Sequence, residues 1–295
     1  MDLPTIHNFR DVGKVASDIK AGLIFRSGHA DDATSEEYNV LRDHYKIRTV
    51  IDLRGMRQWP FLTSTNKVPG QSCNHIPQYP QLVAYTNVLG LSKYYIQLNG
   101  PEYNKHQSDK LNWVERAKLL TEGAMTLATG PPSYPKRISL HLTKDRMSAA
   151  KDMIQYSGPQ IKALFQVLAN SSSYPLVLMD TWGVGHTSLA ICLILLFLEV
   201  DEQNILREYR QSDQELAVFR DKRKEDLRAA GVPEDWVDSD PRYVDVVQRH
   251  LQATYGGIKN YLLGTGLSVS ELRMVHSCLR HNASLSEKQG SLVDI

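Results

Sequence analysis

The stretch from Val177 to Val200 narrows the possible folds of this chain more than any other. It reads VLMDTWGVGHTSLAICLILLFLEV, in which a short apolar run precedes a loop with two glycines and then a long apolar run. A buried strand followed by a glycine-bearing loop and a helix directs several backbone N–H groups at one point, and such loops bind phosphate. The sequence therefore predicts an oxyanion cradle. Asp180 stands in it where a nucleophile would lie, and His186 where a phosphate-binding side chain would lie.

Other segments predict the fold class. Arg48 to Leu53 (RTVIDL) is typical of a buried strand, and Asp52 and Arg54 come at its carboxyl end, where ligands bind in α/β folds. Strands among many helices predict an α/β fold with a parallel-type central sheet flanked by helices and with a helical C-terminal part. Helical spacing recurs over Ser35 to Tyr45, Gly158 to Ala169, Thr187 to Leu198, Asp201 to Gln214, Asp213 to Ala229, Arg242 to Tyr255, Ile258 to Leu263 and Ser268 to Leu279.

The domain organisation is expected to be simple. Residues 1–282 are predicted to form a single domain, and the polar tail 283–295 is expected to be disordered. Within the domain, residues 59–150 form a variable insertion rich in Pro, Gly, Asn and Tyr, for which we expect long loops and an amphipathic helix from Leu111 to Ala128. Such an insertion beside a site is either a lid or an ordinary surface segment.

Composition excludes several function classes. A formal net charge of +1 gives no general attraction to nucleic acid. Cys73, Cys192 and Cys278 lie far apart without zinc-ligand spacing, so we expect no metal, no cofactor and no disulfide framework. The start shows no secretory signal, and the longest apolar run, Leu189 to Leu198, is half the roughly 20 residues of a membrane span. We therefore expect a cytoplasmic protein without a membrane span. The oligomeric state stays open.

Several segments together resemble a known family. They are NFRDVGKVASDIKAGLIFRSGH from Asn8, IRTVIDLRG from Ile47, PLVLMDTWGVGHTSLAICLILLFLEVDEQNILREYRQSD from Pro175, and YVDVVQRHLQATYGGIKNYLLGTGLSVSELRMVHSCL from Tyr243. In this order they resemble a tyrosine phosphatase family that includes secreted bacterial and fungal lipid and protein phosphatases with an NFRDLGG start. The resemblance leaves only about residues 59–150 unmatched, and it implies the phosphatase-like α/β fold.

The signature loop of that family, HCxxGKDRTG, aligns without a gap with Met179 to Ser188. The catalytic cysteine of the pattern falls on Asp180 and its arginine on His186, while Gly183 and Thr187 match the pattern. Further departures include Val184 for lysine, Gly185 for aspartate and Ser188 for the last glycine. The resemblance therefore implies the loop of a phosphatase without its nucleophile and its guanidinium.

A cysteine-dependent phosphatase needs both missing groups to hydrolyse phosphate esters. The reaction takes a thiolate nucleophile and a planar guanidinium that holds the phosphate oxygens. Asp180 is expected to be ionised at the helix start, and a pair of like unit charges about 4 Å apart costs about 4 kcal/mol at an effective dielectric near 20. His186 is expected to be neutral near a helix N-terminus. A protein tyrosine or lipid phosphatase is therefore the least favoured interpretation.

Two other interpretations remain. In the first, Asp180 and His186 are an acid–base pair that cyclises, dehydrates or isomerises a small organic molecule in a specialised biosynthetic pathway. The intact loop favours this interpretation. Substrate contacts would then come from Trp182, Thr181, Gly183, Thr187, Arg10, Arg26, Asp52 and Arg54.

In the second interpretation these residues are structural, and the chain is a catalytically inactive pseudophosphatase that binds a ligand or a protein partner. Asp180 would cap the helix through the N–H groups of Thr181 to Gly183, and Trp182 would fill the emptied pocket. Asp52 and Arg54 would form an internal ion pair, with Arg10 and Arg26 as structural partners of such carboxylates. The positions of these side chains in the structure distinguish the two interpretations.

Overall fold

The computed structural model describes residues 3–54, 73–76, 79–88, 90–114, 117, 145–230 and 232–281. Among them a seven-stranded sheet has the order β1-β2-β7-β3-β6-β5-β4. The pairs β2–β7, β7–β3 and β3–β6 are parallel, whereas the outer pairs β1–β2, β6–β5 and β5–β4 are antiparallel. The strands are β1 (Arg10–Asp11), β2 (Ile24–Ser27), β3 (Thr49–Asp52), β4 (Cys73–Ile76), β5 (Tyr79–Val88), β6 (Leu91–Ile96) and β7 (Leu176–Met179).

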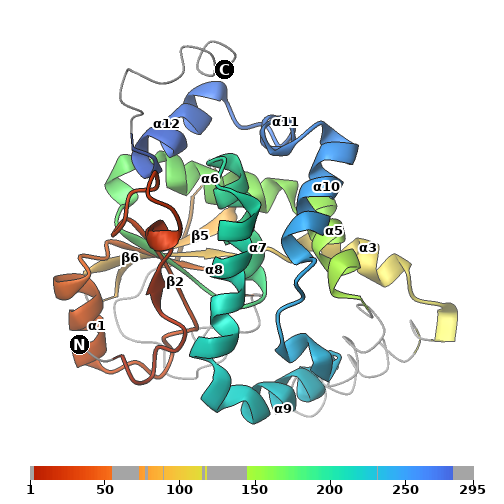
Figure 1. Cartoon of the computed structure of the whole chain (residues 1–295), viewed down its shortest axis with the longest axis horizontal. Coiled ribbons are helices and arrows are strands. Elements are labelled where there is room, and N and C mark those ends of the chain that lie inside the picture. The colour runs from red at the N-terminus through yellow and green to blue at the C-terminus, as the bar shows by residue number, and fades with distance from the viewer. Residues whose placement is uncertain are drawn as a thin grey trace.

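Helices cover the sheet and make up most of the C-terminal half, as the sequence predicts (Figure 1). The short 3-10 helices are η1 (Val12–Val15), η5 (Ser171–Ser173), η6 (Ala217–Phe219) and η7 (Glu234–Val237), and η2 (Val40–His44) is a π-helix. The α-helices are α1 (Ser35–Asn39), α3 (Pro101–Asp109), α5 (Arg146–Tyr156), α6 (Gly158–Ala169), α7 (His186–Phe197), α8 (Glu202–Glu215), α9 (Arg220–Ala230), α10 (Tyr243–Tyr255), α11 (Ile258–Gly264) and α12 (Val269–Leu279).

Strand β7 lies between β2 and β3 in the sheet, and both of its faces are buried. Leu176 and Leu178 face the larger core, whereas Val177 and Met179 face the smaller core on the other side of the sheet. This alternation follows from the two-residue period of a strand. A continuous apolar run is therefore what the sequence of a central parallel strand should show.

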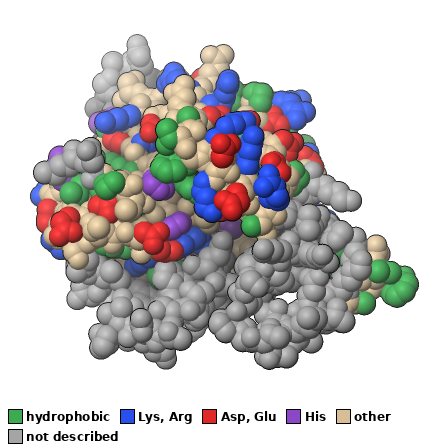
Figure 2. Space-filling view, turned by 90° about the horizontal axis from the view of Figure 1, so that it is seen from below, with side chains coloured by type: hydrophobic (Ala, Val, Ile, Leu, Met, Phe, Trp, Pro, Cys, Tyr) green, Lys and Arg blue, Asp and Glu red, His purple; other side chains and the backbone are tan. Residues whose placement is uncertain are grey.

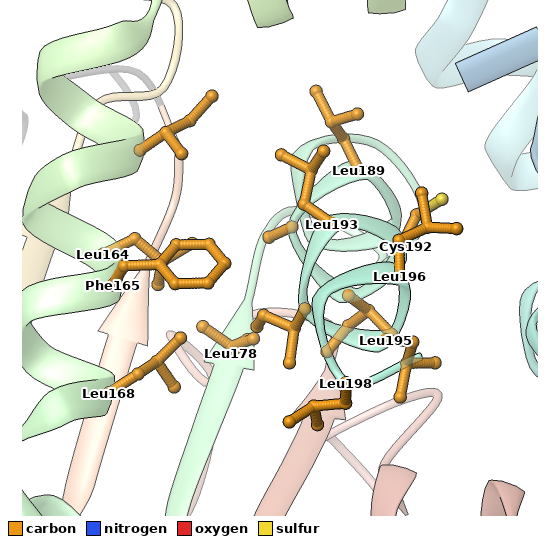
Figure 3. Close-up of a cluster of buried hydrophobic side chains, with 14 of the residues drawn as sticks. Leu164, Phe165, Leu168, Leu178, Leu189, Cys192, Leu193, Leu195, Leu196 and Leu198 are labelled. Carbon is orange, nitrogen blue, oxygen red and sulfur yellow. The ribbon is translucent and has the colours of Figure 1, made fainter. Parts of the chain in front are cut away.

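Helix α7 is apolar on nearly every face because it lies inside the larger core. Its residues from Thr187 to Leu196 are all buried, which matches the predicted helix. Figure 3 shows Leu164, Phe165 and Leu168 of α6 facing the leucines of α7 across Leu178. The helix that starts at the loop is thus held rigidly from several sides, and the loop before it has a fixed support.

Residues 73–109 correct one expectation. We expected long loops there, but the described residues form the strands β4, β5 and β6 and the helix α3. The register pairs Lys93 of β6 with Val50 of β3, so this segment extends the central sheet. Three expectations concern residues that fall mostly outside the described ranges. They are the lid, the helix expected from Leu111 to Ala128, and the disordered tail 283–295.

The outer helix α9 (RDKRKEDLRAA) has a mostly charged surface. Figure 2 views the molecule from the side on which α9 lies, and it shows Lys and Arg side chains interspersed with Asp and Glu. Ion pairs join Arg220 to Asp238 and Arg228 to Glu234. Arg223 is the exception, because it is buried and donates to the carbonyl of Val237 at 2.7 Å. Along the described residues, no helix has the length and apolarity needed to cross a membrane.

Candidate functional site

The loop between β7 and α7 lies at the carboxyl edge of the parallel strands. It begins with Asp180 and ends where His186 opens α7. Gly183 is required within it, because its φ is +70° and a Cβ would lie 2.6 Å from the backbone oxygen of Ser27. The glycine that the resemblance assigns to this position therefore has a geometric reason to be there.

The carboxylate of Asp180 fills the centre of this loop. Its Oδ1 accepts hydrogen bonds from three backbone N–H groups, and its Oδ2 accepts from two more. The donors and their distances are Trp182 at 3.1 Å, Gly183 at 2.6 Å and Val184 at 3.2 Å for Oδ1, and Gly185 at 3.0 Å and Thr187 at 2.9 Å for Oδ2. The side chain is a buried, internal substitute for an oxyanion.

The number of these hydrogen bonds limits what Asp180 can do. An ionised carboxylate has about four lone-pair sites, and five N–H groups are directed at them. Asp180 is also only 5% exposed. Its acceptor capacity is therefore used within the loop. The cap is larger than the expected one, because its donors extend to Thr187 at the start of α7.

His186 lies beside this carboxylate and is partly buried. Its ring forms a hydrogen bond with the backbone of Leu53. Burial lowers the pKa of His186 below its ordinary value, and this outweighs the opposite effects of Asp180, Leu53 and Asp52. The ring is therefore neutral at neutral pH, as expected. The main cause is burial, whereas the sequence suggested the helix dipole.

Trp182 connects the loop to the helices that follow α8. Its Nε1 donates to Asp226 of α9 at 3.0 Å. Its ring centroid lies 5.7 Å from that of Phe219 in η6 and 5.8 Å from that of His7. These contacts hold the indole between the N-terminal segment and α9. The carboxylate of Asp180, rather than the indole, occupies the centre of the cradle.

Arg10 and Arg26 support the loop from underneath. Arg26 is fully buried, and it donates to the backbone oxygen of Gly183 and to Ser188 Oγ. Both arginines also bind Glu208 of α8, through Arg10 Nε at 2.9 Å and Arg26 Nη1 at 2.8 Å. Burial, together with the neighbouring Arg26 charge, lowers the pKa of Arg10 to about 10. The structural partner of the two arginines is thus Glu208, which the sequence analysis did not single out.

Asn8 is a second supporting residue that the sequence analysis did not identify as part of the site. Its Nδ2 donates to the backbone oxygens of Trp182 at 3.0 Å and Gly183 at 3.3 Å. The same amide accepts from Arg10 through its Oδ1. Its position at the start of the NFRD motif was the sequence feature that could have identified it as part of the site.

Asp52 and Arg54 form the expected ion pair, with Arg54 Nη2 2.6 Å from Asp52 Oδ2. Arg54 also binds Asp31, at 2.5 Å and 2.9 Å, so it bridges two carboxylates. Burial opposes ionisation of Asp31, but the hydrogen bonds from Arg54 keep its pKa below the ordinary value. Arg54 is 4% exposed, so its guanidinium is largely satisfied inside the protein.

The predicted residues are thus brought together in two groups. Asp180, Thr181, Trp182, Gly183, His186 and Thr187 share the loop and the start of α7, with Arg10 and Arg26 beneath it. Asp52 and Arg54 lie on the neighbouring strand end, close enough that Asp52 influences His186. In the described part of the chain, no cluster of three or more His, Cys, Asp or Glu side chains could hold a metal ion.

Comparison with known proteins gives a family match for this chain. A family model described as tyrosine phosphatase family matches residues 1–281. The match therefore includes the loop, both arginines and Glu208. A comparison with curated proteins gave no match.

Proposed function

We propose that this chain, which belongs to the tyrosine phosphatase family, is a pseudophosphatase that binds a ligand or a protein partner and does not cleave phosphate esters. One observation carries the proposal: the carboxylate of Asp180 takes the five N–H groups of the cradle. The site that would bind the phosphate is already occupied by the protein itself.

The chemistry of the loop supports the loss of hydrolysis. A phosphate group would have to displace five hydrogen bonds and then approach a fixed carboxylate, at about 4 kcal/mol for each pair of like charges about 4 Å apart. A thiol is present nearby at Cys192, but it is buried in α7 among leucines. Burial raises the pKa of Cys192 to about 12, so this thiol stays protonated and is a poor nucleophile.

A second candidate function is supported by His186. Its neutral ring can accept or donate a proton beside a carboxylate, which is the arrangement that acid–base catalysis on a small organic molecule requires. In this proposal the cyclisation, dehydration or isomerisation is catalysed by Asp180 and His186, with the residues of the loop and the neighbouring strand end around the substrate. Since five N–H groups already use the acceptor sites of Asp180, His186 would carry the proton transfer.

The two candidates predict different outcomes in one experiment. The wild type and the variants Asp180→Asn and His186→Gln are incubated with p-nitrophenyl phosphate, with phosphorylated peptides and lipids, and with an extract of small metabolites. The pseudophosphatase proposal predicts no product from any of them. Turnover of a phosphate ester by the wild type would refute it. Conversion of a metabolite by the wild type, lost in His186→Gln, would replace it with the acid–base enzyme.

A further inference from the structure

The accessible part of the loop between β7 and α7 consists of uncharged groups. Asp180 is the one acidic residue of the loop, and its carboxylate is buried and held by five backbone N–H groups. The loop residues that are at least partly exposed are Thr181, Trp182, Val184, Gly185 and His186. A ligand that approaches the loop therefore first meets these neutral groups.

The hydrogen bond between His186 and Leu53 determines the tautomer of the imidazole. The backbone N–H of Leu53 already donates to the carbonyl oxygen of Met179 at 2.9 Å, so the ring bonds to the carbonyl oxygen of Leu53. Burial lowers the pKa of His186 most, and this hydrogen bond acts in the opposite direction, as a ring N–H that donates must. A neutral imidazole has one N–H donor and one acceptor nitrogen. The second ring nitrogen of His186 is therefore the acceptor.

This acceptor nitrogen selects a ligand that carries a hydrogen-bond donor. Among the described residues no group donates a hydrogen bond to it, and His186 is partly exposed. An ionised carboxylate has acceptors only, so it cannot pair with the lone pair of the ring. An anion would also approach the fixed charge of Asp180, which lies close enough to influence His186. Both arguments favour a donor without a negative charge.

A positively charged donor is disfavoured as well. Helix α7 directs the positive end of its dipole at the loop, and this repels a cation. The carboxylate of Asp226 beside Trp182 does not offset this effect, because it already accepts from the indole and lies 3.2 Å from Lys222 Nζ. The ligand expected at this loop is therefore a neutral group with one donor.

The remaining accessible side chains of the loop favour an aromatic ligand. Trp182 and Val184 are partly exposed, and Gly185 between Val184 and His186 has no side chain to obstruct access. A ring that packs on an indole and an isopropyl group buries apolar area, and aromatic pairs contribute beyond that area. A phenol combines such a ring with a single O–H donor and no charge at neutral pH.

We propose that the loop binds an unphosphorylated phenol group, whose O–H donates to the acceptor nitrogen of His186 and whose ring packs against Trp182 and Val184. The inference rests on the proposed function, a pseudophosphatase that binds a ligand or a partner, and it names the chemical class of what is bound. The phenol belongs either to a tyrosine side chain of a partner protein or to a small phenolic molecule.

The experiment titrates the full-length wild type with four N-acetyl amino-acid amides and follows the imidazole nitrogen resonances of His186 by NMR. The amides of tyrosine, phenylalanine, phosphotyrosine and lysine represent a neutral donor, a neutral ring without a donor, an anion and a cation. We expect the tyrosine amide to bind about 2- to 13-fold more tightly than the phenylalanine amide, which corresponds to one hydrogen bond of about 0.5–1.5 kcal/mol. The two charged amides should bind more weakly than the phenylalanine amide.

The variant His186→Leu removes the acceptor, so its preference for the tyrosine amide over the phenylalanine amide should fall to a ratio of one. The control is His44→Gln at an exposed position of η2, which should keep the preference of the wild type. Titration with p-cresol and with a tyrosine-containing peptide distinguishes the two sources of the phenol. Equal affinities indicate a small phenolic molecule, whereas tighter binding of the peptide indicates a protein partner.

The proposal is overturned if the tyrosine amide shifts no resonance of His186, or if any of the other three amides binds the wild type as tightly or more tightly. These comparisons are made on the wild type, so they do not require that a variant folds. They are also separate from the proposed function. Hydrolysis of the phosphotyrosine amide would refute the pseudophosphatase, while the tyrosine and phenylalanine amides would still report on the phenol site.

Discussion

Replacing Asp180 with alanine should convert the filled cradle into an empty one. Five backbone N–H groups lose their acceptor, and those of Gly183 and Thr187 are buried. Water can reach the outer three, so we count only the two buried donors. A buried donor without a partner costs about 1–3 kcal/mol, so Asp180→Ala should lower the free energy of unfolding by about 2–6 kcal/mol in a buffer without oxyanions.

The decisive measurement is the thermal midpoint of unfolding as a function of phosphate or sulfate concentration, at constant ionic strength. An anion that enters the empty cradle stabilises Asp180→Ala by about 2.7 kcal/mol when its concentration is a hundred times its Kd. A gain of 1 kcal/mol raises the midpoint of a chain of this size by about 2–4 °C. We expect the midpoint of the variant to rise with the anion and that of the wild type to stay constant.

Asp180→Asn is the matched control, because the amide has nearly the same shape but one carbonyl oxygen in place of two carboxylate oxygens. It should lose less stability than Asp180→Ala and respond only weakly to phosphate. If phosphate stabilises the wild type as strongly as it stabilises Asp180→Ala, then the carboxylate does not occupy the anion site, and the argument for a filled cradle fails.

Two further predictions concern the support of the loop and its histidine. Glu208→Ala removes the common partner of Arg10 and Arg26, so chemical denaturation should show that the free energy of unfolding falls by about 3–5 kcal/mol. The control is Glu215→Gln at the exposed end of the same helix, which should change the free energy of unfolding by less than about 0.5 kcal/mol. Equal effects of the two substitutions would contradict the buried network. For His186 the pKa in the folded protein lies below the unfolded value of about 6.5, so the unfolded chain binds more protons. The stability that the neutral ring contributes is complete above about pH 6.5. It is lost as the pH falls from there towards the folded pKa. The stability of His186→Gln should therefore fall less than that of the wild type between neutral and mildly acidic pH, and denaturation curves of equal pH dependence would show that His186 does not contribute.

The local parts of the fold were readable from the sequence because they depend on short-range patterns. The strand and the helix on either side of the loop are continuous apolar runs, and the Asp52–Arg54 ion pair joins residues two positions apart. Glu208 was not predicted, because it meets Arg10 across 198 positions and lies in a helix whose other residues are largely polar. A buried partner of this kind becomes visible only when the chain is folded.

The strands β4 to β6 were missed for a related reason. In β6 the buried positions are Leu91, Lys93 and Tyr95, and the lysine interrupts the alternation of apolar and polar residues. The sequence pattern therefore does not predict a strand there. The side chain that interrupts the pattern is buried, and the charges of Asp52 and Arg54 act on it. A polar residue at a buried position is thus both a cause of failed prediction and a reason to examine the position for chemistry.

The filled cradle also changes how the intact loop is interpreted. From the sequence alone, a loop that retains its glycine and its helix after losing the nucleophile favours a new catalytic activity. The structure supplies a different physical reason for that retention. Five N–H groups that converge at a helix start need an acceptor whether or not a substrate is present, and an emptied cradle would leave the buried ones unsatisfied.

Asp180 meets this need from within the chain, since a single carboxylate carries two oxygens that reach donors from Trp182 to Thr187. The change that removes the nucleophile therefore also removes the dependence of the loop on a bound anion. Preservation of the loop follows from its hydrogen bonds, and it cannot serve as evidence for catalysis. Evidence for catalysis has to come from groups whose placement folding does not require, and the chemical reactivity of His186 is where it should be sought.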